Sequence, residues 1–325
     1  MQPNTRFITI PDGINHVEQL LIDLFILPRI RAVEWSRVTL QTPNMKVGYP
    51  GQHLVSLVTG VTGERSGARG NDLMDGSEIK SCSRVDQVDK CKDCNNSVLR
   101  IESACSDCGS TNIKIKNDSK WLFTIRSEND LRVLTRDMNR VILILADYPE
   151  FALNNFDDIR FEIYEIWPNS PRCARFSELM QNYYENIYSA HIERNPNKTP
   201  APKNFWPESY QFYLCNPIKT FSATVTDSLS NPNIVINSHI PESHDRNLYA
   251  SVDMPIRLLN QQELEHLANA VPVETLRQNN PLFNSVNNPI EILSQTSTLN
   301  EEVRGYLQLR PDSNFTLPAY SRRQN

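Results

Sequence analysis

The 325-residue chain lacks any apolar run near the roughly 20 residues that a helix needs to cross a bilayer. The longest candidate, residues 17–30, is interrupted by Glu18, Asp23 and Pro28. The first residues also lack the basic and then apolar order of a secretory signal peptide. A cytoplasmic location with no membrane partner is therefore the expectation.

Positive charge is not in excess either, because 33 lysines and arginines stand against 38 acids and give a net charge of −5. This is a mild argument against a nucleic-acid partner, since phosphates are normally neutralised by a basic surface. It does not exclude one, because an acidic active site can coexist with a segregated basic surface. Arginine supplies 23 of the 33 basic residues, and its guanidinium suits bidentate contacts to phosphate and guanine.

Two familiar catalytic signatures are missing. The chain has no glycine-rich loop of the P-loop type, so coupling to nucleotide hydrolysis is not expected. Its six histidines show neither HxH nor HExxH spacing, and none is assigned a catalytic role. With 39% hydrophobic and 22% charged residues, the composition is that of a globular protein.

The seven cysteines are not expected to form a disulfide framework in a chain without a leader. Four of them form two CxxC pairs separated by ten residues: Cys91, Cys94, Cys105 and Cys108. Each CxxC turn directs two thiolates at one ion, so the four together predict a tetrahedral Zn²⁺ site. Protein fills every ligand position, which predicts a structural zinc ribbon inserted at about residues 88–112. The other three have no partner at ligand spacing and are expected to be buried thiols: Cys82, Cys173 and Cys215.

Hydrophobic periodicity predicts helices and strands that mix along the first half of the chain. Such mixing is typical of an α/β fold around a mixed sheet. The expected helices cover residues 14–27 (ending at Pro28), 51–61 and 128–138, and the expected strands cover 121–125, 141–146 and 159–167.

The second half differs in its pattern of polar and apolar residues, which predicts a division into residues 1–168 and 169–325. We expect the latter to be largely helical. Its expected segments are a helix at 177–192, a loop at 195–207, a strand within 212–226 and an irregular stretch at 228–248.

Residues 67–81 carry the pattern that says most about chemistry. If Asp72 starts one strand, and Glu78 and Lys80 lie on one face of the next, the three side chains can meet. Paired carboxylates suit a hard cation such as Mg²⁺, and a nearby lysine can orient or deprotonate a water. These are the requirements of metal-dependent phosphodiester hydrolysis. The residues alone leave open a solvated strand edge with a surface ion pair.

Two nearby patterns compete with this assignment. Asp75 lies only three residues before Glu78, which leaves little room for a strand and a turn, so Asp72 is favoured. Asp118-Ser119-Lys120 is a second acid-x-Lys match, but its middle residue is polar. Ile79 is apolar and would face the core, which favours Glu78 and Lys80.

Several short runs together resemble a known nuclease core. They are Gly51-Gln52-His53-Leu54, Gly63-Glu64-Arg65-Ser66, Asp72 and Gly76-Ser77-Glu78-Ile79-Lys80-Ser81. Their layout is similar to the PD-(D/E)XK nucleases of the MutH type. The stretch from Asp72 to Asp93, with Ser119-Lys120-Trp121-Leu122-Phe123, resembles the MamI-type restriction endonucleases more closely.

The resemblance implies a PD-(D/E)XK, restriction-endonuclease-like core at about residues 50–167 and Mg²⁺-dependent cleavage of double-stranded DNA at a defined sequence, usually by a homodimer. It implies that Asp72 and Glu78 bind the metal and that Lys80 positions or activates the attacking water. The chain departs from the pattern in two places. Asn71 replaces a common proline, and Val55 stands where MutH-like enzymes carry an acid. A third acid would then come from Glu64 or Glu18, or be absent.

Residues 262–277 resemble a helix-turn-helix whose second helix would present Thr275, Arg277 and Gln278 to a major groove. An ordinary helical hairpin remains the slightly favoured alternative. The tail residues Arg310, Arg322 and Arg323 are candidates for phosphate contacts.

A non-enzymatic zinc-ribbon DNA-binding regulator is the alternative function. Such a protein shares the ribbon and the helical pair with the nuclease, and only the acidic motif discriminates between them.

Overall fold

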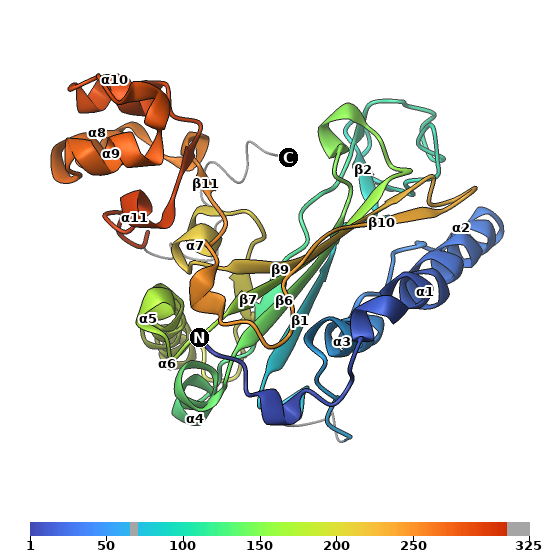
Figure 1. Ribbon diagram of the computed structural model, residues 1–325. Helices are drawn as coiled ribbons and strands as arrows, with labels where there is room; N and C mark the ends of the chain where they lie inside the picture. Colours follow the sequence, from blue (N-terminus) through green and yellow to red (C-terminus); the bar gives the residue numbers. More distant parts are fainter. Residues whose placement is uncertain (66–70, 311–325) are drawn as a thin grey trace.

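The computed structural model describes residues 1–65 and 71–310, and its centre is a five-stranded sheet of order β1-β6-β7-β9-β10 (Figure 1). β1 and β6 are parallel and the other neighbours are antiparallel, so the expected mixed sheet in an α/β fold is confirmed. Residues 67–70 of the acidic motif, Ser66, Arg322 and Arg323 lie outside the described residues. The strands are β1 (Glu78–Ser83), β6 (Val141–Asp147), β7 (Ile159–Ile166), β9 (Ile218–Thr226) and β10 (Asn233–His239).

Helices cover both faces of this sheet (Figure 1). Every residue of the central strand β6 is buried, and successive side chains enter two different apolar clusters. Ile142 and Ile144 pack with α1 and α3, whereas Leu143 and Leu145 pack with α5 and α7. The helices of the first layer are α1 (Val17–Leu21), α2 (Leu27–Thr39) and α3 (Gly48–Thr59), and those of the second are α4 (Glu128–Arg132), α5 (Ala174–Tyr183), α6 (Ala190–Arg194) and α7 (Tyr210–Leu214).

The expected end of the first helix at Pro28 is wrong. The chain passes from α1 through a π-helical turn into α2, and Pro28 lies in the first turn of α2. A proline lacks an N–H and its ring crowds the carbonyl four residues back. The wider π turn gives that ring room, so the helix continues to Thr39. The π turns are Ile22–Ile26, Val133–Asp137 and Tyr184–Ser189, and the 3-10 turns are Thr5–Phe7, Gly13–His16, Phe151–Leu153, Pro171–Cys173, Arg246–Leu248, Ile256–Leu258 and Pro281–Phe283.

Two strands, β8 (Lys203–Phe205) and β10 (Asn233–His239), lie where the sequence predicts a loop or an irregular stretch. β5 (Trp121–Phe123) is a strand as expected, but it pairs with β8 in a separate sheet. β8 falls in the stretch expected to be a loop. β10 occupies the stretch expected to be irregular, because an edge strand needs backbone partners on one side only and tolerates an Asn- and Ser-rich sequence.

The main sheet takes strands from both sides of residue 168, since β9 and β10 pair onward from β7. The largely helical unit begins only after β10 and packs through Leu267, Leu276 and Val303 against the same cluster as α5. It contains α8 (Gln261–Ala270), α9 (Val273–Asn279), α10 (Pro289–Ser294) and α11 (Glu301–Arg304), with β11 (Met254–Pro255) and β12 (Thr298–Leu299).

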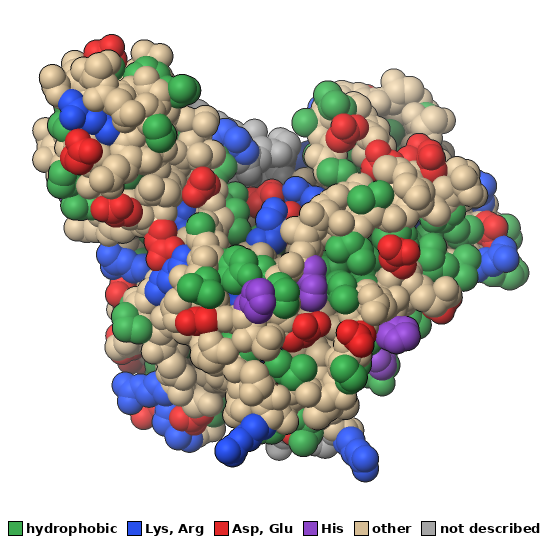
Figure 2. Space-filling model, in the orientation of Figure 1, with side chains coloured by type: hydrophobic (Ala, Val, Ile, Leu, Met, Phe, Trp, Pro, Cys, Tyr) green, Lys and Arg blue, Asp and Glu red, His purple; other side chains and the backbone are tan. Residues whose placement is uncertain are grey.

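The cysteine-rich insertion lies between β1 and β6 and forms its own sheet of order β3-β2-β4. Its strands are β2 (Asp89–Cys91), β3 (Ser97–Val98) and β4 (Ile113–Lys114). The surface is hollowed between the lobe of α8–α11 and the lobe that carries β2 (Figures 1 and 2). Across the described residues, we find no helix with the length and apolar character that a membrane crossing requires.

Candidate active site and metal centre

Asp72 lies in a compact turn that leads into the edge strand β1. The N–H groups of Asp72 and Leu73 donate to the Ser77 carbonyl at 3.0 and 3.2 Å. Gly76 adopts a φ of 84°, a left-handed conformation that glycine adopts without strain. Asp72 does not start a regular strand as expected, because Leu73 makes only an isolated bridge with Gly63. The turn nevertheless returns the chain beside Asp72 at the start of β1.

Side chains alternate along β1 as the sequence predicts. Ile79 is 6% exposed and packs in the cluster beneath α1 and α3. Glu78 and Lys80 point the other way, with side chains 17% and 27% exposed. The Lys80 ammonium donates a hydrogen bond to Glu78 Oε1. A carboxylate and an amine are therefore held together at the start of the edge strand.

The Asp72 carboxylate is fixed by two neutral donors. Its Oδ2 accepts from the backbone N–H of Ile79 at 2.7 Å, and its Oδ1 accepts from Gln52 Nε2 of α3 at 2.7 Å. Gly51 brings α3 close to the sheet, since a Cβ there would lie 2.6 Å from Ile144 Cδ1. The glycine and glutamine of the Gly-Gln-x-Leu run thus act together. Neither donor cancels the negative charge of Asp72.

Burial raises the pKa of Glu78, Lys80 opposes that rise, and the charge of Asp72 adds to it, so the pKa lies above its usual value. Asp72 and Glu78 are close enough to repel each other. A bound divalent cation would relieve this repulsion, and carboxylate oxygens are the ligands that Mg²⁺ prefers. The donor set therefore fits such a cation.

Asp75 has a different environment. It is buried in a salt bridge to Arg140, with an N···O distance of 2.9 Å, and Arg140 also contacts Glu165 at 2.8 Å. The Arg140 Nε donates to Ser77 Oγ at 3.0 Å, and the Arg140 carbonyl accepts from the Glu78 N–H at 3.0 Å. These contacts hold the turn in place. Sequence reasoning missed Arg140, which lies 65 residues from Asp75.

No third acid joins Asp72 and Glu78 within the described ranges. There, the four cysteines are the one group of three or more His, Cys, Asp or Glu side chains arranged to hold a metal. Glu18 and Glu64 are exposed, and Val55 is fully buried in the apolar cluster.

The competing acid-x-Lys pattern does not form a comparable site. The Asp118 carboxylate accepts from Lys116 at 2.8 Å, and the Lys120 ammonium lies 4.5 Å from the Trp206 ring centroid. Asp118 and Lys120 are thus held by different partners.

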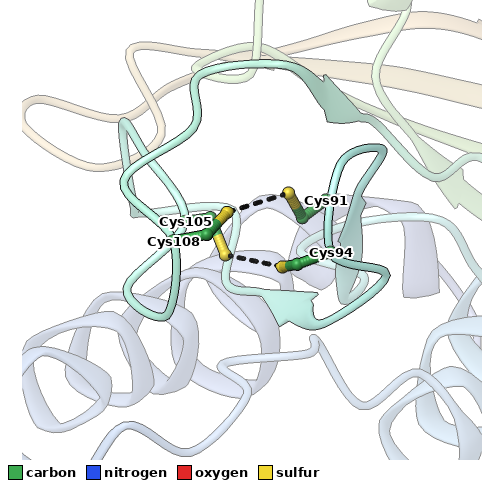
Figure 3. Close-up of side chains that lie close together, drawn as sticks. All are labelled: Cys91, Cys94, Cys105 and Cys108. Atoms are coloured by element: carbon green, nitrogen blue, oxygen red, sulfur yellow. Dashed lines mark hydrogen bonds between the residues drawn. The ribbon is translucent and has the colours of Figure 1, made fainter.

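The four ribbon cysteines converge from two loops (Figure 3). Their Sγ atoms all lie within 4.8 Å of one another, and the Cys91–Cys108 and Cys94–Cys105 pairs are 3.6 Å apart. Zn–S bonds of about 2.3 Å in a tetrahedron place sulfurs about 3.8 Å apart. The geometry fits a tetrahedral Zn²⁺ site with no open position. The remaining cysteines are free and buried as expected: Cys82, Cys173 and Cys215.

The candidate recognition residues are not presented together. Thr275 is buried at 9% exposure, and the Arg277 Nε donates to the Val286 carbonyl at 2.9 Å. Gln278 is exposed and alone among the three stays open to a ligand. In the tail, the Arg310 guanidinium lies 3.9 Å from the Tyr210 ring centroid and bonds to Glu263 at 2.7 Å.

Similarity to known proteins extends over more than half of the chain. A model of the MamI restriction endonuclease family matches residues 34–257, which is more than half of the chain. Over 74 residues the chain is 35% identical to the type II restriction enzyme MamI of Microbacterium ammoniaphilum, and this match covers 23% of the chain and 24% of that protein. The chain thus spans about a quarter of this relative's length. No solved structure matches. The chain belongs to the MamI restriction endonuclease family.

Proposed function

We propose that the protein is a type II restriction endonuclease that hydrolyses both strands of double-stranded DNA at a specific sequence with Mg²⁺. The observation that carries the proposal is the meeting of Asp72, Glu78 and Lys80 at the start of β1, within the family match. This arrangement supports a PD-(D/E)XK core. The buried salt bridge of Asp75 supports Asp72 as the first acid.

Each residue would have a distinct role in the hydrolysis. Asp72 and Glu78 would hold Mg²⁺, which stabilises the negative charge that develops on the scissile phosphate. Gln52 and the Ile79 N–H fix the orientation of the Asp72 carboxylate. Lys80, which bonds to Glu78, would orient the attacking water beside the acids.

The zinc would have a structural role, held by Cys91, Cys94, Cys105 and Cys108. A site whose four ligands all come from the protein leaves no position for substrate. The zinc would therefore stabilise the fold of the ribbon.

A cytoplasmic location also stays a prediction from the sequence.

A homodimer would supply one active site for each DNA strand. Helix α2 extends from the body of the molecule (Figure 1). It exposes apolar side chains in its first turn and near its end. Leu27, Trp35 and Val38 are 48%, 66% and 73% exposed, which favours burial against a second copy by two-fold symmetry. Sedimentation of the wild type and of Trp35→Glu tests this. We expect the wild type to be a dimer and the substitution to weaken it. A monomeric wild type would contradict the proposal.

Incubation with unmethylated plasmid and Mg²⁺ tests the main proposal. We expect discrete linear fragments from the wild type, and none from Asp72→Asn or Glu78→Gln. The matched control is Asp118→Asn, which alters the other acid-x-Lys pattern and should cut normally. Undiminished cutting by both active-site variants would sink the assignment. Retarded but intact DNA from the wild type would favour the non-enzymatic regulator, and open circles would favour a nickase.

A further inference from the structure

One face of the ribbon concentrates lysine, a residue that is otherwise scarce in this chain. Four of the ten lysines lie between residues 90 and 116. Lys90 of β2 and Lys114 of β4 are direct partners in the antiparallel register, and both are exposed. Their Cβ atoms are therefore about 5 Å apart on the same side of the sheet. Lys92, also exposed, follows two residues after Lys90. We call Lys90, Lys92 and Lys114 the lysine face.

This face is not neutralised by the ribbon's own acids. Within residues 1–65 and 71–310, Lys90 and Lys114 make no ion pair. Hydrogen bonds from Ser110 and Asn112, and the charge of Lys92, lower the pKa of the Asp93 carboxyl, so the uncompensated charge of the face is that of Lys90 and Lys114. Asp89 forms its ion pair with Arg100, whereas Asp107 and Glu102 accept from neutral donors, Asn96 and the Leu99 N–H, and none of the three pairs with a lysine of the face.

Like charges placed directly opposite each other on paired strands destabilise a sheet. The Lys90–Lys114 pair therefore costs stability in a small sheet that holds few apolar residues, namely Cys91, Val98 and Cys105 with Cys94 and Ile113. A ligand that carries closely spaced negative charges would turn this cost into binding energy. The phosphate backbone of a nucleic acid is such a ligand.

The ribbon is also fixed to the sheet that carries the active site. The Arg100 guanidinium bonds to Asp89 at 2.6 and 2.8 Å and lies 4.7 Å from the ring centroid of Phe156. It lies 5.8 Å from the Tyr148 ring centroid, and both rings belong to the connection between β6 and β7. The lysine face therefore has a defined position relative to β1.

The distance to the active site suits a single duplex. Ten residues separate Lys80 from Lys90, and an extended chain of ten residues spans at most about 35 Å. B-DNA rises about 3.4 Å per base pair, so this is about one helical turn. The lysine face therefore lies no farther from Lys80 than about one helical turn of a duplex.

We propose that the lysine face binds the DNA phosphate backbone beside the cleavage site and adds affinity without reading sequence. This inference rests on the proposed function, because it takes DNA as the substrate. Contacts to phosphates position a protein on the duplex but carry no base information. The competing explanation is that the lysines offset the negative charge of four thiolates around a metal, in which case their loss would weaken zinc binding and leave DNA affinity unchanged.

The test compares three double variants of the full chain with the wild type. Lys90→Gln/Lys114→Gln removes two charges from the face, and Lys90→Arg/Lys114→Arg keeps them. Arg194→Gln/Lys198→Gln removes two exposed charges elsewhere. Binding of a random 40-base-pair duplex is measured by fluorescence anisotropy over a series of salt concentrations, with Ca²⁺ in place of Mg²⁺, and zinc content is measured in parallel.

We expect the glutamine variant of the face to retain zinc and to bind about tenfold more weakly at low salt. The slope of log K against log salt should flatten by about 1.8, since each lost phosphate contact contributes about 0.9. The arginine variant and the distant control should keep the wild-type slope. A wild-type slope in the glutamine variant, or zinc loss with unchanged DNA affinity, would overturn the inference. If the wild type neither binds the duplex nor cuts plasmid, the proposed function itself fails.

Discussion

Three acids lie within seven residues of one turn, and their surroundings differ completely. Asp75 is buried against Arg140, whose guanidinium also contacts Glu165, so its charge is satisfied inside the protein. Among the described residues, Asp72 receives only an amide and a backbone N–H, and Glu78 shares one lysine at a partly exposed edge. The first arrangement stabilises a fold, whereas the second leaves negative charge for a cation. The partners of an acid, and not its spacing, separate the two roles.

The largest expected effect is at the partly exposed group of Asp72, Glu78 and Lys80. Replacing Lys80 with methionine keeps the length of the side chain but removes the group that can orient water. Cleavage should fall by about 10²- to 10⁴-fold, the usual contribution of a positioned proton-transfer group. Single-turnover cleavage of plasmid measures this loss, with DNA affinity in Ca²⁺ as the control that should stay unchanged. A cleavage rate within threefold of wild type would show that Lys80 does not take part in catalysis.

Removal of the buried Arg140 should lower the stability of the fold. Arg140→Met leaves Asp75 and Glu165 without their shared partner, and loss of one member of a buried pair costs about 3–5 kcal/mol. Urea unfolding should show this decrease in the free energy of unfolding. The control is Arg132→Met, whose partner Asp137 is 43% exposed, and surface pairs of this kind contribute about 0–1 kcal/mol. Equal losses in the two variants would contradict the distinction.

A double-mutant cycle sharpens the same point. Asp75→Asn in the Arg140→Met background removes a buried unpaired charge, so the double variant should recover about 1–3 kcal/mol relative to Arg140→Met alone. Additive losses would show that the two residues do not interact. Asp75→Asn alone should cut DNA far faster than Asp72→Asn, measured under conditions where both remain folded.

A smaller effect is expected at Gln52. Gln52→Leu removes one of the two donors that fix the Asp72 carboxylate, so cleavage should fall about tenfold and the Mg²⁺ concentration for half-maximal rate should rise. Gln19→Leu is the matched control, because Gln19 Nε2 also donates to an acid, Asp23, but at an exposed position. An unchanged Mg²⁺ dependence in Gln52→Leu would show that the amide does not position the acid.

Local features of the fold and the site could be predicted from the sequence, whereas contacts between residues far apart in the chain could not. Alternation around Ile79 and the spacing of the CxxC pairs are set by neighbours in the chain, so both could be predicted. The Asp75–Arg140 pair joins residues 65 apart, and no local pattern records it. The strand β10 was missed because its stability comes from backbone pairing with β9. The helix through Pro28 depends on a π turn, which composition does not reveal.

The smallest expected effect is a difference in pH dependence between the two kinds of acid. Burial raises the pKa of Glu165, but Arg140 and Arg246 outweigh it, so the pKa lies below its usual value of 4.5. A carboxyl with a lowered folded pKa stabilises the fold above pH 4.5 and loses that contribution as the pH falls through the folded pKa. Glu78, whose pKa is raised, has the opposite sign: its protonation favours the folded state as the pH falls towards 4.5. Urea unfolding between about pH 3 and 7 should therefore show a shallower acid-induced loss for Glu165→Gln than for wild type, and a steeper one for Glu78→Gln. Identical slopes for the two variants would mean that the fully buried Glu165 and the partly buried Glu78 share one electrostatic environment, which their different partners argue against.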